Sequence, residues 1–171
     1  MPIDPDLPFR SLAVGVLTLS DTRTEADDTS GDLLVALATE AGHTVPRRAI
    51  IPDDQATIER TLVAWAEDPA IEVILTTGGT GLTRRDVTPE AVRAVADKEI
   101  VGFGELFRQI SYTTVGTSSM QSRALGAIVR GTPVFALPGS NGACRDGWSV
   151  LRDQLDSRHR PCNFPQIFER L

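Results

Sequence analysis

Leu12-Ala-Val-Gly-Val-Leu-Thr-Leu19 is the stretch that determines the fold. It is almost continuously apolar and rich in branched side chains, which is typical of a strand buried on both faces. The segments after it alternate between helical and strand-like patterns. Expected helices begin near residue 30, after residue 54 and at residue 88, and expected strands cover 44–51, 72–77 and 133–137. This alternation predicts an α/β protein, a three-layer α/β/α sandwich with a mostly parallel central sheet.

The chain is expected to form one domain over residues 1–171, a length that supports a single core. The core is placed at about residues 12–156. Two further helices are expected in it, one over 105–112 and one that carries Cys144, Trp148, Leu151 and Leu155 on one face. The tail, residues 157–171, is expected to be extended against its own subunit or a partner, because it combines polar residues with apolar ones such as Phe164 and Phe168.

Composition excludes several classes of protein. The chain has 17 Lys plus Arg against 23 Asp plus Glu, a net charge of −6, so there is no basic excess to bind nucleic acid. No apolar run approaches the roughly 20 residues that span a bilayer. Residues 1–10 are acidic and contain proline, unlike a signal peptide. Cys144 and Cys162 lack the spacing of a disulfide framework or zinc site. We therefore expect a cytoplasmic protein without nucleic-acid or membrane partners.

Three expected strands run directly into loops rich in glycine or hydroxyl groups. These loops are Ser20-Asp21-Thr22, Gly78-Gly79-Thr80-Gly81 and Pro138-Gly139-Ser140-Asn141-Gly142. Carboxyl ends of parallel strands meet at one edge of a sheet, so the loops predict an amide-lined anion pocket there. The glycine loop matches neither a Walker A motif nor a dinucleotide fingerprint, and an isolated glycine pair more often serves a tight turn. A binding role is favoured by the arginine pair and carboxylate that follow, Arg84-Arg85-Asp86.

The aspartates near these loops have two interpretations. Asp86 is either a loop acid paired with Arg84 or Arg85, or a metal ligand. Asp53 and Asp54 either cap the following helix, or one of them joins Asp86 to hold Mg²⁺. Spacing alone does not decide between these interpretations.

Six short motifs occur in order along the chain. They are Leu17-Thr-Leu-Ser-Asp-Thr22, Thr76-Thr-Gly-Gly-Thr-Gly81, Arg85-Asp-Val-Thr-Pro-Glu-Ala91, Gly102-Phe-Gly-Glu105, Ser122-Arg123 and Leu137-Pro-Gly-Ser140. In this combination the chain resembles the MoaB/MogA family of molybdenum cofactor biosynthesis proteins, which is related to the gephyrin G domain and its plant counterpart. The resemblance extends from about residue 12 to residue 164, and the segment 142–164 is most similar to the MoaB branch.

The resemblance implies Mg-ATP-dependent adenylylation of molybdopterin, which gives adenylyl-molybdopterin and pyrophosphate. The family's catalytic and metal-binding aspartates correspond to Asp53 and Asp86. The nucleotide and phosphates are expected near Ser20 and the loop 78–81, and the pterin near Ser122 and the turn 138–139. The expected binding residues are Ser20, Asp21, Thr77, Gly78, Gly79, Thr80, Gly81, Arg85, Ser122, Arg123, Pro138, Gly139 and Ser140.

The resemblance further implies a homotrimer or a dimer of trimers, with other molybdenum cofactor biosynthesis proteins as candidate partners. Arg85 and Arg123 are expected to provide a local positive field for phosphate-bearing ligands on this acidic protein. Two alternatives stay open. One is a molybdopterin-binding pathway protein with weak or no catalysis, and the other is an assembly protein whose site has decayed. Intact Asp53, Asp86 and glycine loop argue against decay.

Overall fold

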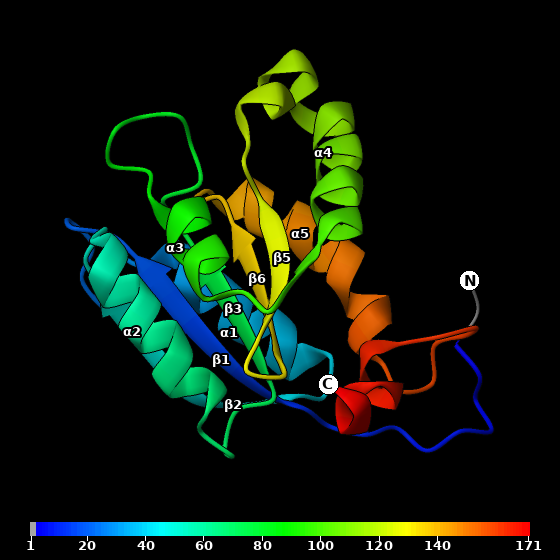
Figure 1. Cartoon of the computed structure of the whole chain (residues 1–171). Helices are drawn as coiled ribbons and strands as arrows, with labels where there is room; N and C mark the ends of the chain where they lie inside the picture. Colours follow the sequence, from blue (N-terminus) through cyan, green and yellow to red (C-terminus); the bar gives the residue numbers. More distant parts are fainter. Residues whose placement is uncertain (1–2) are drawn as a thin grey trace.

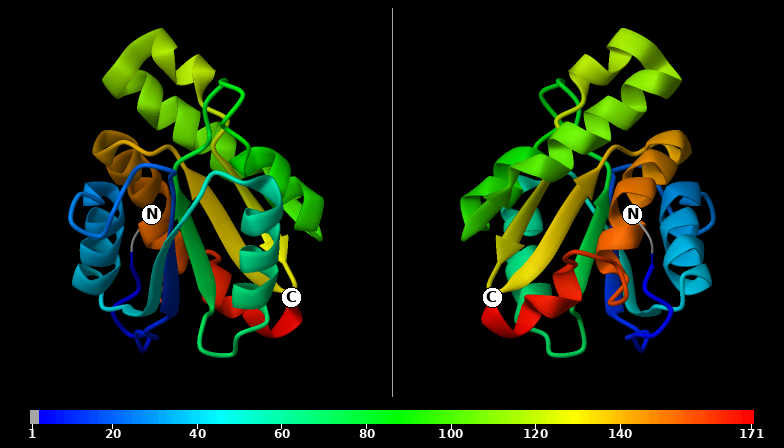
Figure 2. Two further views of the ribbon diagram at one scale, coloured as in Figure 1. Left: turned by 90° about the vertical axis from the view of Figure 1, so that its left-hand side faces the viewer. Right: turned by 90° about the vertical axis from the view of Figure 1, so that its right-hand side faces the viewer.

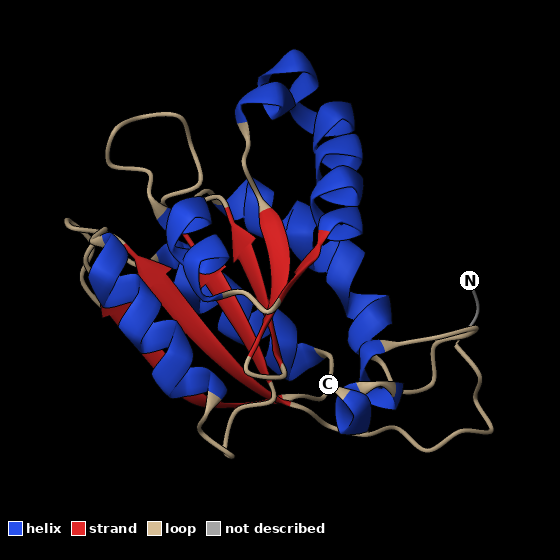
Figure 3. Cartoon of the chain, in the orientation of Figure 1, coloured by secondary structure: helices blue, strands red, loops and turns tan. Residues whose placement is uncertain are grey.

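A six-stranded sheet forms the centre of the protein (Figures 1 and 3). In the computed structural model, which describes residues 3–171, the strand order is β2-β1-β3-β6-β5-β4. The strands are β1 (Ala13–Leu19), β2 (Thr44–Ile51), β3 (Val73–Thr77), β4 (Lys98–Ile100), β5 (Leu125–Val129) and β6 (Thr132–Leu137). β2, β1, β3 and β6 pair in parallel, whereas β5 pairs antiparallel with both β6 and β4. The mostly parallel sheet is confirmed, and β2 lies at its edge. Its register with β1 shifts between the pair of Ala13 with Thr44 and the pair of Gly15 with Arg47, the stretch that contains Pro46.

Helices cover both faces of the sheet, as the two side views in Figure 2 show. They are α1 (Thr29–Glu40), α2 (Gln55–Ala66), α3 (Thr88–Val95), α4 (Val101–Val115) and α5 (Asn141–Leu155). Leu34 of α1 and Trp148 of α5 belong to one apolar core, and Ile58 of α2 and Val92 of α3 belong to a second core on the other face. The predicted three-layer sandwich is therefore confirmed. None of the described helices is long and apolar enough to cross a membrane.

β4 and β5 have no counterpart among the strands expected from the sequence. β5 is a short, fully buried apolar run, and periodicity alone assigns such a run to neither a strand nor a helix. β4 has three residues, too few to show any pattern. β5 turns back into β6 through Arg130 and Gly131, whose φ angles are 49° and 83°. This hairpin explains why the sheet is not parallel throughout.

Two further details differ from expectation. Helix α4 begins at Val101 and is longer than predicted, and with the 3₁₀ turn η1 (Gly116–Gln121) it projects beyond the sheet at the top of Figure 1. We call α4 and η1 the arm. At the start of α3, Val87 and not Thr88 is the capping residue, because the Thr88 hydroxyl donates instead to the Gly78 carbonyl at 3.0 Å.

The tail packs on its own domain and is not extended. It forms two 3₁₀ turns, η2 (Phe164–Gln166) and η3 (Phe168–Arg170). The Phe164 ring lies edge-on to the core ring of Phe135, with 5.4 Å between the ring centroids. Burial in the subunit's own core therefore accounts for the apolar character of the tail.

Candidate functional site

The three predicted loops meet at one edge of the sheet. The N–H of Gly78, after β3, donates to the carbonyl of Leu137, the last residue of β6, at 3.0 Å. A Cβ atom on Gly78 would lie 2.2 Å from the carbonyl oxygen of Leu19, the last residue of β1. A Cβ atom on Gly139 would lie 3.4 Å from the Gly78 Cα atom. The ends of β1, β3 and β6 are thus in direct contact, as the parallel arrangement predicts.

The glycine loop needs glycine both for its backbone conformation and for space. Gly78 and Gly79 have φ angles of 114° and 63°, in the left-handed region that other residues rarely adopt. A Cβ atom on Gly79 would lie 2.3 Å from the Thr88 hydroxyl oxygen and 2.9 Å from Oδ1 of Asp53. The tight-turn interpretation is confirmed. The turn also places the backbone of Gly79, which has no side chain, next to the carboxylate of Asp53.

Asp53 and Asp54 have different environments. The Asp54 carboxylate caps α2, accepting hydrogen bonds from the N–H of Thr57 at 2.8 Å and from its hydroxyl at 2.6 Å. These hydrogen bonds lower the pKa of Asp54. Oδ1 of Asp53, in contrast, is buried and has no hydrogen-bond partner. Burial, and then the negative charge of Asp86, raise the pKa of Asp53.

Asp86 is held beside Gly81, two residues further along the glycine loop than the Gly79 that Asp53 approaches. Its Oδ2 accepts hydrogen bonds from the N–H of Thr83 at 2.8 Å and from the Thr83 hydroxyl at 2.6 Å. A Cβ atom on Gly81 would lie 2.9 Å from the same oxygen. Burial alone would raise the pKa of Asp86, but the hydrogen bonds from Thr83 and from the Gly81 N–H, together with the charge of Arg123, outweigh burial and lower the pKa. Asp86 is thus ionised at neutral pH and close enough for its charge to act on Asp53.

A site formed by these two carboxylates suits a magnesium ion better than a structural transition-metal ion. Among residues 3–171, no three His, Cys, Asp or Glu side chains cluster in a way that could hold a metal ion. Mg²⁺ is usually bound through one or two carboxylates and keeps several waters or substrate oxygens. The unpartnered oxygen of Asp53 is free to serve as a ligand of such an ion, and a buried carboxylate oxygen without a partner is costly.

Arg85 and Arg123 are both engaged within the protein. Arg85 pairs with Asp21, whose other oxygen accepts the N–H of Asp53 at 3.1 Å. Arg123 donates from Nε to the Gly81 carbonyl at 2.7 Å and from Nη2 to the Asp86 carbonyl at 2.5 Å. Its Nη1 pairs with Glu90. The structure therefore pairs neither arginine with Asp86's carboxylate, and it uses Arg123 to brace the loop that carries Asp86.

Replacing Arg123 with alanine is expected to lower the free energy of unfolding by about 1–3 kcal/mol, because buried carbonyls of the loop lose a charged donor. Urea unfolding measures this. The matched control is Arg93→Ala, which breaks an exposed pair with Glu99 and should cost at most about 1 kcal/mol. Equal free energies of unfolding for Arg123→Ala and wild type would show that Arg123 does not brace the loop.

Two hollows lie at this edge of the sheet. The first, of about 420 Å³, lies between the arm and the start of α5, and we call it the arm pocket. Its lining residues include Phe107, Ser111, Ser122, Pro138, Ser140, Gly142 and Arg145. The second, of about 450 Å³, is lined by Ser20, Asp21 and Arg23 together with residues 50–52, and we call it the Asp21 pocket. Five of the thirteen predicted binding residues line these pockets: Ser122, Pro138 and Ser140 line the arm pocket, and Ser20 and Asp21 line the Asp21 pocket. The other eight line neither pocket, and Thr77 and Thr80 among them are buried.

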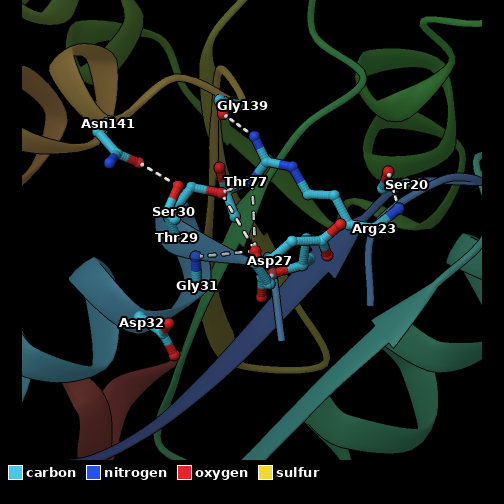
Figure 4. Close-up of polar contacts among 12 residues, drawn as sticks. Ser20, Arg23, Asp27, Thr29, Ser30, Gly31, Asp32, Thr77, Gly139 and Asn141 are labelled. Carbon is cyan, nitrogen blue, oxygen red and sulfur yellow. Dashed lines mark hydrogen bonds and ion pairs between the residues drawn. The ribbon is translucent and has the colours of Figure 1, made fainter. Parts of the chain in front are cut away.

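A buried ion cluster that was not expected from the sequence lies beside the site. Asp28 caps α1 and is completely buried, and it pairs with Arg23 at 3.3 Å and with Arg48 at 2.9 Å. Figure 4 shows the guanidinium of Arg23 reaching from this cluster to Gly139. The cap could have been expected from an aspartate just before Ser30-Gly31, but the two arginines come from a loop and a distant strand.

The fold and the site define the class of α/β domains whose candidate ligand site lies at the carboxyl edge of a mostly parallel sheet, here with a glycine loop and two carboxylates. The family model described as "Probable molybdopterin binding domain" matches residues 15–157. The chain belongs to this family, the MoaB/MogA family of molybdenum cofactor biosynthesis proteins.

Individual relatives agree with this assignment. Molybdenum cofactor biosynthesis protein B of Escherichia coli K12 is 46% identical over 157 residues, which cover 91% of this chain and 92% of the relative. The protein of the same name from Bacillus cereus is 53% identical over 131 residues, which cover 76% and 78%. The crystal structure of the tungsten cofactor synthesizing protein MoaB from Pyrococcus furiosus superposes with a TM-score of 0.78 at 35% identity, covering 85% of this chain and 93% of that one.

Proposed function

We propose that this protein catalyses the Mg-ATP-dependent adenylylation of molybdopterin. A phosphate oxygen of molybdopterin forms a bond to the α-phosphorus of ATP, and the bond from that phosphorus to the β-bridging oxygen breaks. The products are adenylyl-molybdopterin and pyrophosphate. Membership of a molybdenum cofactor biosynthesis family supports the pathway, and the site supports the reaction type.

The observation that carries the proposal is the buried, unpartnered Oδ1 of Asp53 beside Gly79, with Asp86 beside Gly81 and close enough for its charge to act on Asp53. Asp53 and Asp86 would hold Mg²⁺, which when bound neutralises charge that develops on the phosphates. Two carboxylates at a phosphate site would otherwise repel the substrates.

The remaining residues serve positioning, which is the main requirement of phosphoryl-type transfer. The bare backbone of Gly78 and Gly79 allows close approach of a phosphate. We assign the pterin to the arm pocket, whose volume of about 420 Å³ suits a small ligand. The nucleotide is assigned to the Asp21 pocket, which the Asp21 side chain links to Asp53 through a 3.1 Å hydrogen bond.

The test is incubation of the full-length protein with Mg-ATP and molybdopterin under anaerobic conditions, followed by mass spectrometry. We expect adenylyl-molybdopterin to form, and its formation to stop when EDTA replaces Mg²⁺. Binding of molybdopterin without the adduct would instead favour a binding protein of the pathway. Absence of both would favour an assembly protein.

We also propose that the protein forms a homotrimer or a dimer of trimers. The support is a set of large apolar side chains that the arm leaves 51–82% exposed. They are Val101, Leu106, Tyr112, Val115 and Met120. Since the tail packs on its own subunit, the arm is the better candidate for the contact.

Light scattering on the full-length protein is expected to give three or six times the protomer mass of 18.4 kDa. Met120 is 82% exposed, so Met120→Glu should leave the protomer folded and weaken assembly. A monodisperse monomer at micromolar concentration would overturn the proposal. We place the protein in the cytoplasm with ATP and molybdopterin as ligands, and with other molybdenum cofactor biosynthesis proteins as candidate partners.

A further inference from the structure

The carboxylate of Asp28 is completely buried and has no part in the reaction proposed above. It accepts hydrogen bonds from the N–H of Gly31 at 3.0 Å and from the Thr18 hydroxyl at 2.7 Å. Its ion pairs with Arg23 and Arg48 come from two different segments of the chain. Burying such a cluster requires the removal of several charged groups from water, and this desolvation offsets the stabilisation by the ion pairs. We therefore expect the cluster to serve by fixing the positions of neighbouring groups.

Arg23 connects this cluster to the turn after β6 (Figure 4). Its Nη1 faces Asp28 and the hydroxyl of Ser30, and its Nη2 donates to the Gly139 carbonyl at 2.9 Å. The preceding carbonyl of the turn, that of Pro138, accepts the Thr77 hydroxyl at 3.1 Å. Hydrogen bonds from Thr77 and Arg23 therefore fix the orientation of the two successive peptide groups of the turn.

The direction of the Ser140 N–H follows from the Gly139 carbonyl. In a planar trans peptide the C=O and N–H bonds point in opposite directions. Because Arg23 binds the Gly139 carbonyl, the N–H of Ser140 in the same peptide group points away from Arg23. Within the described chain, this N–H donates no hydrogen bond.

The turn that carries this N–H contributes residues to the arm pocket. Pro138 and Ser140 line that pocket, whereas Arg23 lines the Asp21 pocket. The Gly139–Ser140 peptide group thus connects Arg23, which lines the Asp21 pocket, with Ser140, which lines the arm pocket, and its N–H donor faces away from Arg23. Such a donor suits an anionic ligand group.

We propose that Arg23, anchored by Asp28, is a positioning residue that orients the Ser140 N–H toward an anionic group of the phosphate-bearing pterin in the arm pocket. The assignment of the pterin rests on the proposed function. Arg48 provides the internal comparison, because it also pairs with Asp28 but contacts Asp32 and not the turn.

The test compares Arg23→Met with the matched variant Arg48→Met in the full-length protein. Each removes one charged partner of Asp28, so both should lower stability, but only Arg23→Met releases the Gly139 carbonyl. Anaerobic titration with molybdopterin should show a dissociation constant raised about 10-fold or more in Arg23→Met, as expected for one lost hydrogen bond to a charged group, and unchanged in Arg48→Met. In ¹⁵N NMR spectra of the free protein, the Ser140 amide should shift and exchange its hydrogen faster only in Arg23→Met.

Equal losses of affinity in the two variants would mean that Arg23 only neutralises Asp28, and would overturn the proposal. So would wild-type affinity in Arg23→Met. If Arg23→Met does not fold, Arg23→Lys replaces it, since one amine keeps the charge but cannot span Asp28 and Gly139. If the wild-type protein binds no molybdopterin, the proposed function fails, and the Ser140 amide signal still decides whether Arg23 orients the turn.

Discussion

Replacing Asp53 with asparagine is expected to slow adenylyl transfer at least about 100-fold, because even second-shell partners of a metal are worth about 10–100-fold. The same change should raise the thermal stability of the metal-free protein at neutral pH. Burial and the charge of Asp86 raise the pKa of Asp53, so the folded protein binds this proton more tightly than the unfolded chain does. Protonated Asp53 therefore contributes to the stability of the fold at low pH, and this contribution is lost as the pH rises through the folded-state pKa of Asp53. Because asparagine is neutral at every pH, the Asp53→Asn protein does not lose this stability at neutral pH.

Single-turnover transfer and melting curves across a Mg²⁺ series measure both effects. Mg²⁺ should raise the melting temperature of the wild-type protein and leave that of Asp53→Asn unchanged. The matched control is Asp54→Asn, one residue further on, where asparagine is an equally good helix cap. That control should keep both the Mg²⁺ response and the transfer rate. An Asp53→Asn protein that still responds to Mg²⁺ and transfers at the wild-type rate would refute the metal assignment.

Replacing Asp86 with asparagine is also expected to slow transfer at least about 100-fold and to increase the Mg²⁺ concentration required, since a metal ligand is lost. Molybdopterin affinity should change little, because the arm pocket is lined by other residues. The hydrogen bonds that lower the pKa of Asp86 keep it ionised at neutral pH, so the variant removes a real charge.

Thr83→Val distinguishes the charge of Asp86 from its role in the loop. This variant removes the 2.6 Å hydroxyl hydrogen bond but keeps the carboxylate and the 2.8 Å bond from the Thr83 N–H. We expect a much smaller loss of rate and a normal Mg²⁺ requirement. Equal losses in Thr83→Val and Asp86→Asn, measured by the same single-turnover assay, would identify Asp86 as a loop acid only.

The sequence by itself determined the layered architecture. Hydrophobic runs bounded by glycine, proline and capping residues are local signals, and they predicted β1, β3, β6 and the buried face of α5. Proline lacks an N–H, so Pro46 predicted that β2 is an edge strand. The loops after β1, β3 and β6 followed from topology, because parallel strands place their carboxyl ends together.

Only the tertiary structure decided what each polar side chain of the site does. Asp53 and Asp54 are adjacent residues of the same type, so the sequence does not distinguish them. Their roles differ because Thr57 donates hydrogen bonds to the Asp54 carboxylate, whereas Gly79 of the glycine loop packs against the Asp53 carboxylate. Arg123 is engaged by carbonyls about 40 residues away in the sequence, which no local pattern records. The same holds for Arg23, which contacts Gly139 across 116 positions. Hydrogen bonds and burial depend on neighbours in space, whereas periodicity depends on neighbours in sequence.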